Sequence, residues 1–130
     1  MKIVDLHAHT TASDGTDTPE ELVKKSRERG IEIIAITDHD TATAYPELKA
    51  ACDEYGLECI LGTEFTSPSP VCCHITAFNF DPEYPEMREL LAFASSISTE
   101  RTRLLFKWGR ERGSLREGVS WEEVLADHPE

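Results

Sequence analysis

Two histidines near the start of the chain are spaced so that they could bind one cation. His7 and His9 are separated by a single residue, and Asp5 lies two residues before His7. Side chains two residues apart in an extended strand point to the same face, so both imidazoles and the carboxylate would share one side. Two imidazoles crowded together favour a shared cation, and this spacing therefore indicates metal binding.

Other potential ligands recur near the ends of later apolar segments. Asp14 occupies the loop after the first segment, and His39 closes the second. Glu64 follows the third segment, and His74 lies within the fourth. The carboxyl ends of parallel strands meet at one edge of a sheet, so we expect these side chains to converge there. Imidazole combined with carboxylate suits borderline divalent ions such as Zn²⁺, Mn²⁺ or Fe²⁺.

Each of these residues, taken alone, also has a purely structural interpretation. A single histidine in a strand, such as His74, is usually a satisfied structural residue. Asp14 before Gly15 is typical of turn chemistry, and Asp38 and Asp40 could cap a turn. What favours metal binding is the recurrence of such residues at one end of every predicted strand.

The segments that position these residues alternate between strands and helices. Apolar patterns predict four strands, at residues 3–9, 31–37, 57–62 and 71–78. A capping box at Thr18 opens one helix, which ends at Gly30, and a second helix runs from Pro46 to Tyr55. Strands that alternate with helices in this way predict a parallel sheet with right-handed crossovers.

The pattern changes after residue 82. Residues 85 to about 112 show helical periodicity, with a stripe of large apolar side chains at Leu90, Phe93, Ile97, Leu104 and Trp108. The run Ser120-Trp121-Glu122-Glu123 is a capping box that opens a shorter helix. We therefore divide the chain into a strand-rich part, 1–82, and a helical part, 83–130, within one structural unit.

Length and composition limit the classes of protein. A chain of 130 residues accommodates one domain and is too short for a complete (β/α)₈ barrel of about 250 residues. Its formal net charge of −12 disfavours an extended nucleic-acid groove or an anionic membrane surface. We see neither an apolar run near the roughly 20 residues of a membrane-spanning helix nor a secretory signal. Four cysteines without CxxC spacing are expected to be free thiols in the cytoplasm.

The motifs and their order resemble the PHP (polymerase and histidinol phosphatase) domain family. The segments that carry the resemblance are Asp5-Leu6-His7-Ala8-His9-Thr10, Ser13-Asp14-Gly15, Thr37-Asp38-His39-Asp40-Thr41, Gly62-Thr63-Glu64 and His74-Ile75. Residues 73–82, the long helix with Arg101 and Arg103, and residues 120–124 are similar to stand-alone PHP phosphoesterases. The resemblance covers essentially the whole chain.

This resemblance implies an α/β fold, the parallel-stranded N-terminal part of a distorted (β/α)₇ barrel, followed by helices of an inserted subdomain. It also implies up to three divalent ions. In the family pattern His7, His9 and Glu64 bind the first ion. Glu64 bridges to a second ion, which His74 also binds, while Asp14 and His39 bind the third.

The resemblance also implies roles for neighbouring residues. Asp5 and Asp38 would lie outside the ligands and orient them, and Asp40 and His39 would be the catalytic residues. Arg101 falls on the apolar stripe of the long helix. A guanidinium there must bind an anion, either a carboxylate or a substrate phosphate, and the family context favours phosphate.

Three further residues have no assigned role. Cys72 shares the strand face of His74, so it could approach a metal or be an ordinary buried side chain. Cys73 is adjacent to it, and neighbouring cysteines suit neither a zinc ribbon nor a normal disulfide. His128 comes too early for the family's later His-Pro motif, and we expect a solvated residue there.

Three functions follow as hypotheses. The first is a metal-dependent phosphoesterase in which a metal-activated water hydrolyses a small phosphate ester, a nucleotide or an oligonucleotide end. The second is a truncated metal-binding PHP domain with little or no activity of its own, whose exposed strand edges invite a homo-oligomer or swapped dimer. The third is a metal-dependent amidohydrolase, whose site begins with a similar pair of histidines.

Overall fold

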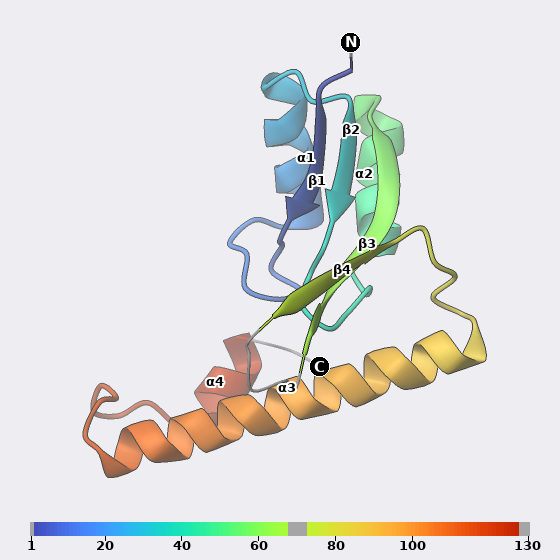
Figure 1. The fold of residues 1–130 in the computed structure, drawn as a ribbon. Helices are drawn as coiled ribbons and strands as arrows, with labels where there is room; N and C mark the ends of the chain where they lie inside the picture. Colours follow the sequence, from blue (N-terminus) through green and yellow to red (C-terminus); the bar gives the residue numbers. More distant parts are fainter. Residues whose placement is uncertain (1, 68–72, 128–130) are drawn as a thin grey trace.

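The computed structural model describes residues 2–67 and 73–127. Its elements in chain order are β1 (Val4–Ala8), α1 (Pro19–Glu28), β2 (Ile33–Ile36), α2 (Tyr45–Tyr55), β3 (Glu58–Thr66), β4 (His74–Phe78), α3 (Pro85–Glu111) and α4 (Trp121–Asp127). The strands form one sheet in the order β1-β2-β3-β4, with α3 crossing beneath the ends of β1, β2 and β3 (Figure 1).

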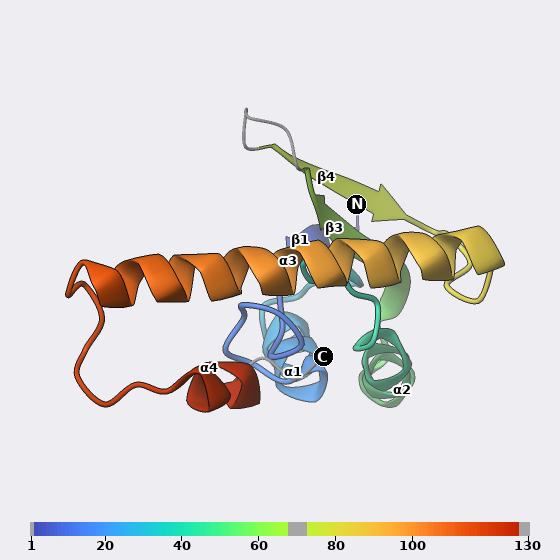
Figure 2. The ribbon, with the colours of Figure 1, turned by 90° about the horizontal axis from the view of Figure 1, so that it is seen from below.

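The first three strands are parallel, as the alternation of strands and helices predicts. β2 lies between β1 and β3, and its residues Ile34, Ala35 and Ile36 are buried. Helices α1 and α2 lie side by side on one face of this sheet (Figure 2). Val23 from α1 and Leu48 from α2 are fully buried in the core with Ile34. The core therefore fixes the strands whose ends carry the candidate ligands.

The fourth strand corrects the prediction of a wholly parallel sheet. β4 runs antiparallel to β3, with Thr66 opposite His74 and Glu64 opposite Thr76. A parallel crossover needs about a dozen residues or more, and only residues 67–73 connect these two strands. β3 is also longer than predicted, so Glu64 lies inside it rather than after it. This antiparallel direction places the beginning of β4 at the carboxyl end of β3. His74 therefore lies at the same edge of the sheet as the other candidate ligands.

The predicted ends of the helices are confirmed. In the capping box of α1, the Glu21 N–H donates to Thr18 Oγ1 at 3.2 Å, and the Thr18 N–H donates to Glu21 Oε2 at 3.0 Å. Gly30 and Gly56 follow α1 and α2 with φ angles of 79° and 72°, in the left-handed region that glycine adopts most readily. These local signals set where each helix stops and the next strand begins.

Helix α3 forms where the periodicity predicts it, but the predicted apolar stripe is not buried. Leu90, Phe93, Leu104 and Trp108 are between 45% and 61% exposed. The helix is about 40 Å long, and it turns hydroxyl-bearing side chains rather than this stripe toward the pocket beside the sheet. Within the described residues, no helix is both long enough and apolar enough to cross a membrane.

Candidate metal centre

Glu64 is the hub of a cluster of imidazoles at the carboxyl edge of the sheet. Its side chain is only 6% exposed. Oε2 lies 3.1 Å from His7 Nε2 and 3.0 Å from His9 Nε2. Oε1 lies 3.0 Å from His74 Nδ1, and Oε2 lies 3.9 Å from His39 Nε2. One buried carboxylate thus faces four imidazoles that come from three separate segments of the chain.

Asp14 provides a second carboxylate on the other side of His9. Its Oδ1 lies 2.7 Å from His9 Nδ1, and its Oδ2 lies 3.6 Å from His39 Nε2. His9 therefore contacts Glu64 with one ring nitrogen and Asp14 with the other. The rings of His9 and His39 are 4.7 Å apart between centroids, and those of His39 and His74 are 4.8 Å apart.

All six predicted ligands are brought together by the fold. They form three overlapping groups whose ligand atoms lie within 4.8 Å of one another, namely His7-His9-Glu64, His9-Asp14-His39 and His39-Glu64-His74. Neutral imidazoles and ionised carboxylates are ligands of borderline divalent cations, and a cation would share their lone pairs. The donor set therefore fits divalent metal ions.

The loop that carries Asp14 is held in place by Asp38. The carboxylate of Asp38 accepts hydrogen bonds from the Thr10 N–H at 2.7 Å, from Thr10 Oγ1 at 2.7 Å and from Ser13 Oγ at 2.6 Å. Asp38 is 1% exposed, so these bonds form away from water and the carboxylate is satisfied by the loop. Asp5 has a related role at β1, because its Oδ1 accepts the His7 N–H at 3.2 Å.

Asp40 occupies an unusual backbone position between β2 and α2. Its φ is 56°, its N–H donates to the Glu64 carbonyl at 3.1 Å, and its Oδ1 accepts the Thr66 N–H at 2.8 Å. The residue is 2% exposed, and within the described part of the chain Oδ2 is buried without a hydrogen-bond partner. Among the same described residues, His39 Nδ1 is also buried without a hydrogen-bond partner. Such unpaired groups are unusual in a folded protein and cluster at functional sites.

The imidazoles also set the ionisation of the two carboxylates. Burial acts to raise the pKa of Glu64, but the hydrogen bond with His7 and the charges on His39, His7 and His74 lower the pKa below its ordinary value of 4.5. Burial likewise opposes ionisation of Asp14, while the hydrogen bond and charge of His9, with that of His39, lower its pKa below 3.8. Both groups are therefore anionic near neutral pH, the form that binds a cation.

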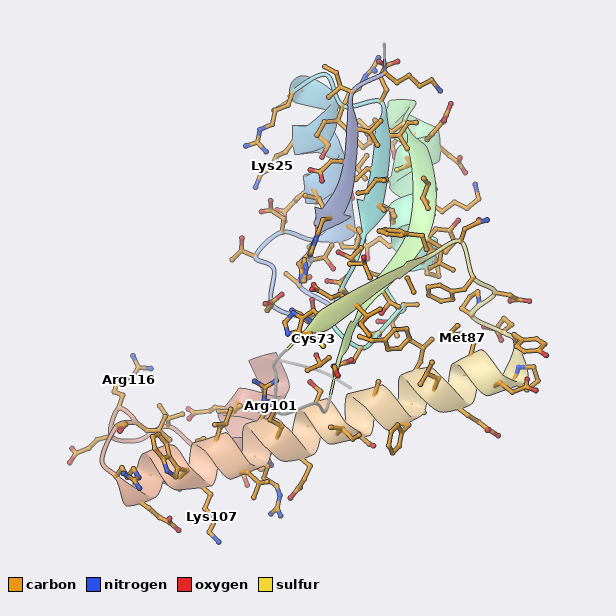
Figure 3. All side chains as sticks on the ribbon, viewed as in Figure 1. Lys25, Cys73, Met87, Arg101, Lys107 and Arg116 are labelled. Carbon is orange, nitrogen blue, oxygen red and sulfur yellow. The ribbon has the colours of Figure 1, made fainter. Side chains whose placement is uncertain are left out.

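A pocket of about 470 Å³ opens beside the cluster, with Asp14, His39, Asp40 and His74 in its wall. Arg101 lines the same pocket from α3, and Figure 3 shows where it leaves that helix. Two other parts of the wall were not predicted from the sequence: the hydroxyl-bearing side chains of α3, and Trp121 from α4. The hydroxyl-bearing residues of α3 in the wall are Ser95, Ser98, Thr99 and Thr102. Because residues three and four positions apart lie on the same face of a helix, this spacing could have predicted a hydroxyl-rich face of α3.

Of the three residues without an assigned role, one lies within the described part of the chain. Cys73 is an exposed free thiol. Cys72 and His128 lie outside the described residues.

A parallel-rich sheet that gathers imidazoles and carboxylates beside a pocket defines an α/β protein with a candidate metal centre. The family model described as the PHP domain matches residues 5–113. The chain therefore belongs to the PHP domain family, as the order of its motifs predicts.

Two curated relatives illustrate the similarity. The chain is 39% identical over 101 residues to a 5'-3' exoribonuclease from Haemophilus influenzae, a match that covers 77% of this chain and 37% of the relative. It is 32% identical over 104 residues to the 3',5'-nucleoside bisphosphate phosphatase from Chromobacterium violaceum, covering 79% of this chain and 36% of that protein. The chain thus spans little more than a third of the length of these relatives.

Solved structures confirm the curled, parallel-rich α/β fold. A protein from Bifidobacterium adolescentis, assigned as a metal-dependent phosphoesterase, superposes with a TM-score of 0.79 at 37% identity, over 99% of this chain and 44% of that chain. An amidohydrolase from Chromobacterium violaceum, with bound sulfate and no metal, gives a TM-score of 0.79 at 26% identity, over 96% of this chain and 47% of that one.

Proposed function

We propose that this chain forms the centre of a metal-dependent phosphoesterase that hydrolyses a small phosphate ester, a nucleotide or an oligonucleotide end. The observation that carries the proposal is the convergence of four imidazoles and two carboxylates beside a pocket that Arg101 also lines. The two curated relatives are named for reactions that cleave phosphate esters, which supports the same bond as the target here.

The three overlapping ligand groups would hold the metal ions, with His9, His39 and Glu64 each belonging to two groups. Nitrogen and oxygen ligands of this kind suit Mn²⁺, Zn²⁺ or Fe²⁺. When bound, such ions supply Lewis-acid stabilisation of the phosphoryl oxygens and lower the pKa of a coordinated water toward neutrality. Asp38 and Asp5 would position the ligands rather than bind metal. Asp38 holds the loop that carries Asp14, and Asp5 accepts the His7 N–H in β1.

Two residues of the pocket would act on the substrate itself. Arg101 presents a planar, permanently charged guanidinium that can bind phosphate oxygens with two parallel hydrogen bonds. The Thr66 N–H fixes one oxygen of Asp40 and leaves Oδ2 free to accept the proton of the attacking water. Asp40 and His39 thus line the pocket as the proposed catalytic residues, with His39 doubling as a ligand.

The charge of the molecule favours a small substrate over a long polyanion. The net charge of −12 repels a long polyanion, whereas a single ester needs only the cations of the pocket. Arg101 is the one lysine or arginine among the described residues that line this pocket. We therefore propose that the chain binds one nucleotide-sized phosphate ester and has no extended nucleic-acid groove.

The test compares two carboxylates of the same strand. Glu64→Gln removes the hub of the cluster, whereas Glu58→Gln changes an exposed carboxylate six residues earlier in β3, roughly 20 Å away at the opposite edge. The proposal predicts Mn²⁺-dependent hydrolysis of a chromogenic phosphate ester by the wild-type protein and by E58Q, and loss of turnover in E64Q and in a His9→Ala, Glu64→Ala double variant. Unchanged turnover in the double variant would contradict the assignment.

The second candidate is a metal-binding domain with little turnover of its own. It is favoured by the exposed apolar side chains of α3, which leave a surface for self-association. Tight metal binding without hydrolysis in the same assays would support it, and self-association would then be measured by analytical ultracentrifugation. An amide substrate assayed in parallel distinguishes an amidohydrolase, the activity named for one solved neighbour.

A further inference from the structure

An aromatic side chain that the proposed chemistry does not use forms part of the pocket wall. Trp121 lines the pocket together with His39, His74 and Arg101. It is half-buried and is the first residue of α4. The metal cluster and the guanidinium account for a phosphate, but a large indole ring beside them needs a different chemical partner.

The position of the indole is fixed by a ring contact with α3 and by the capping box of α4. The ring of Phe106 in α3 lies 5.6 Å from the ring of Trp121 between centroids, tilted by 57°, a geometry that aromatic pairs prefer. The start of α4 is fixed by a capping box, in which the Glu123 N–H donates to Ser120 Oγ at 3.1 Å and the Ser120 N–H donates to Glu123 Oε2 at 2.7 Å. The indole of Trp121 is thus held in a defined position at the pocket wall.

The rest of the wall suits a group that is flat and carries polar edges. Hydroxyl side chains from α3, among them Ser98 and Thr102, line the pocket beside the indole. They can donate to and accept from ring nitrogens or sugar hydroxyls. A volume of about 470 Å³ lies within the range of small-molecule sites and accommodates a single nucleotide.

We propose that Trp121 stacks on the nucleobase of the substrate, so that the pocket selects nucleotides over phosphate esters that lack an aromatic ring. This inference rests on the proposed phosphoesterase function and names its substrate class. Every base has a π-face, so stacking on Trp121 contributes affinity without selecting one base sequence. Removing one such stacking partner weakens binding by roughly tenfold.

The experiment compares two substrates that share the same phosphoryl group and ribose but differ in the base, adenosine 5'-monophosphate and ribose 5-phosphate. Trp121→Ala is expected to raise KM for the nucleotide about tenfold and to leave KM for ribose 5-phosphate unchanged. Trp121→Phe keeps an aromatic ring and should restore most of the affinity. Trp108→Phe is the matched control, because Trp108 packs against Arg112 outside the pocket and should change neither KM.

A binding measurement separates this inference from the catalytic proposal. The chain has two tryptophans, so Trp108→Phe leaves Trp121 as the sole reporter, and Trp121→Phe leaves Trp108. Adenosine, which has no phosphate to hydrolyse, should quench the fluorescence of the first variant and not of the second, and ribose should quench neither. Equal quenching in both variants, no quenching in either, or equal KM changes for both substrates in Trp121→Ala would overturn the inference. Failure of the wild-type protein to hydrolyse either phosphate would contradict the catalytic proposal and leave the quenching result to decide this one.

Discussion

Replacing Gly15 with alanine should distort the metal centre from a position that holds no ligand. A Cβ at Gly15 would lie 2.3 Å from the carbonyl oxygen of His9, 2.4 Å from its carbonyl carbon and 2.6 Å from the Thr10 nitrogen. All three atoms are backbone, so no side chain can rotate away. Ordinary contact begins at 3.4 Å, and the loop must therefore move by about 1 Å.

The magnitude follows from what this movement disturbs. Overpacking a rigid site costs about 1–3 kcal/mol, and we expect the upper end because the clash is with backbone on the strand side of the loop. The loop also carries Asp14, whose contact with His9 is 2.7 Å, so a shift of this size breaks the second ligand group. Metal affinity should fall by at least the 10- to 100-fold typical of losing a residue that orients a ligand.

The assay combines urea unfolding of the metal-free protein with calorimetric titration of Mn²⁺. Gly56→Ala is the control, since Gly56 has a φ of 72° but its Cβ would meet nothing within 4 Å. That variant should cost about 1 kcal/mol of stability through backbone strain and leave the metal affinity unchanged. A Gly15→Ala protein with wild-type stability and wild-type metal affinity would refute the steric reasoning.

Three more predictions concern stability and reactivity. Asp38→Asn should lower the free energy of unfolding by about 2–4 kcal/mol in urea melts, because the hydrogen bonds from Thr10 lose a charged acceptor. A change below about 0.5 kcal/mol would contradict the role of Asp38 in holding the loop. The lowered pKa of Glu64 contributes stability that is present above its unfolded pKa near 4.5 and is lost as the pH falls through the lower folded value. The metal-free protein should therefore weaken on acidification below about pH 4.5, and Glu64→Gln should flatten that dependence in urea melts taken at several pH values. Burial raises the pKa of Cys52 to about 12, so peptide mapping after iodoacetamide treatment at pH 8 should find Cys73 modified and Cys52 protected until the protein is unfolded. Modification of Cys52 in the folded protein would show that this part of the core opens.

Local chemistry made much of the fold predictable from the sequence. The capping box at Thr18 and the glycine at position 30 act within one helical turn, so the bounds of α1 follow from nearest neighbours. The continuous apolar run of β2 reflects burial on both faces. The convergence of His9, His39 and Glu64 was predictable because parallel strands place their carboxyl ends together, whereas His74 reaches the same edge through the antiparallel β4.

The features that sequence reasoning missed depend on contacts between distant segments. An apolar run such as 71–78 does not encode the direction of its neighbour, so the antiparallel pairing of β4 depended on the short connection to β3. The apolar stripe of α3 is exposed, and the periodicity that predicts a helix does not identify what the helix packs against. Trp121 reaches the pocket through the turn after α3, which no local pattern specifies. The division of the chain at residue 82 stays a prediction.

The central claim is that one buried glutamate and its imidazoles form a centre for more than one metal ion. Metal content per chain, measured by mass spectrometry on size-fractionated protein loaded with Mn²⁺, tests it most directly. Glu64 belongs to two of the three ligand groups, so Glu64→Gln leaves only the group of His9, Asp14 and His39 intact. We expect more than one ion per wild-type chain and at most one in E64Q. A wild-type protein that holds no more than one ion, or an E64Q protein with the wild-type content, would contradict this claim.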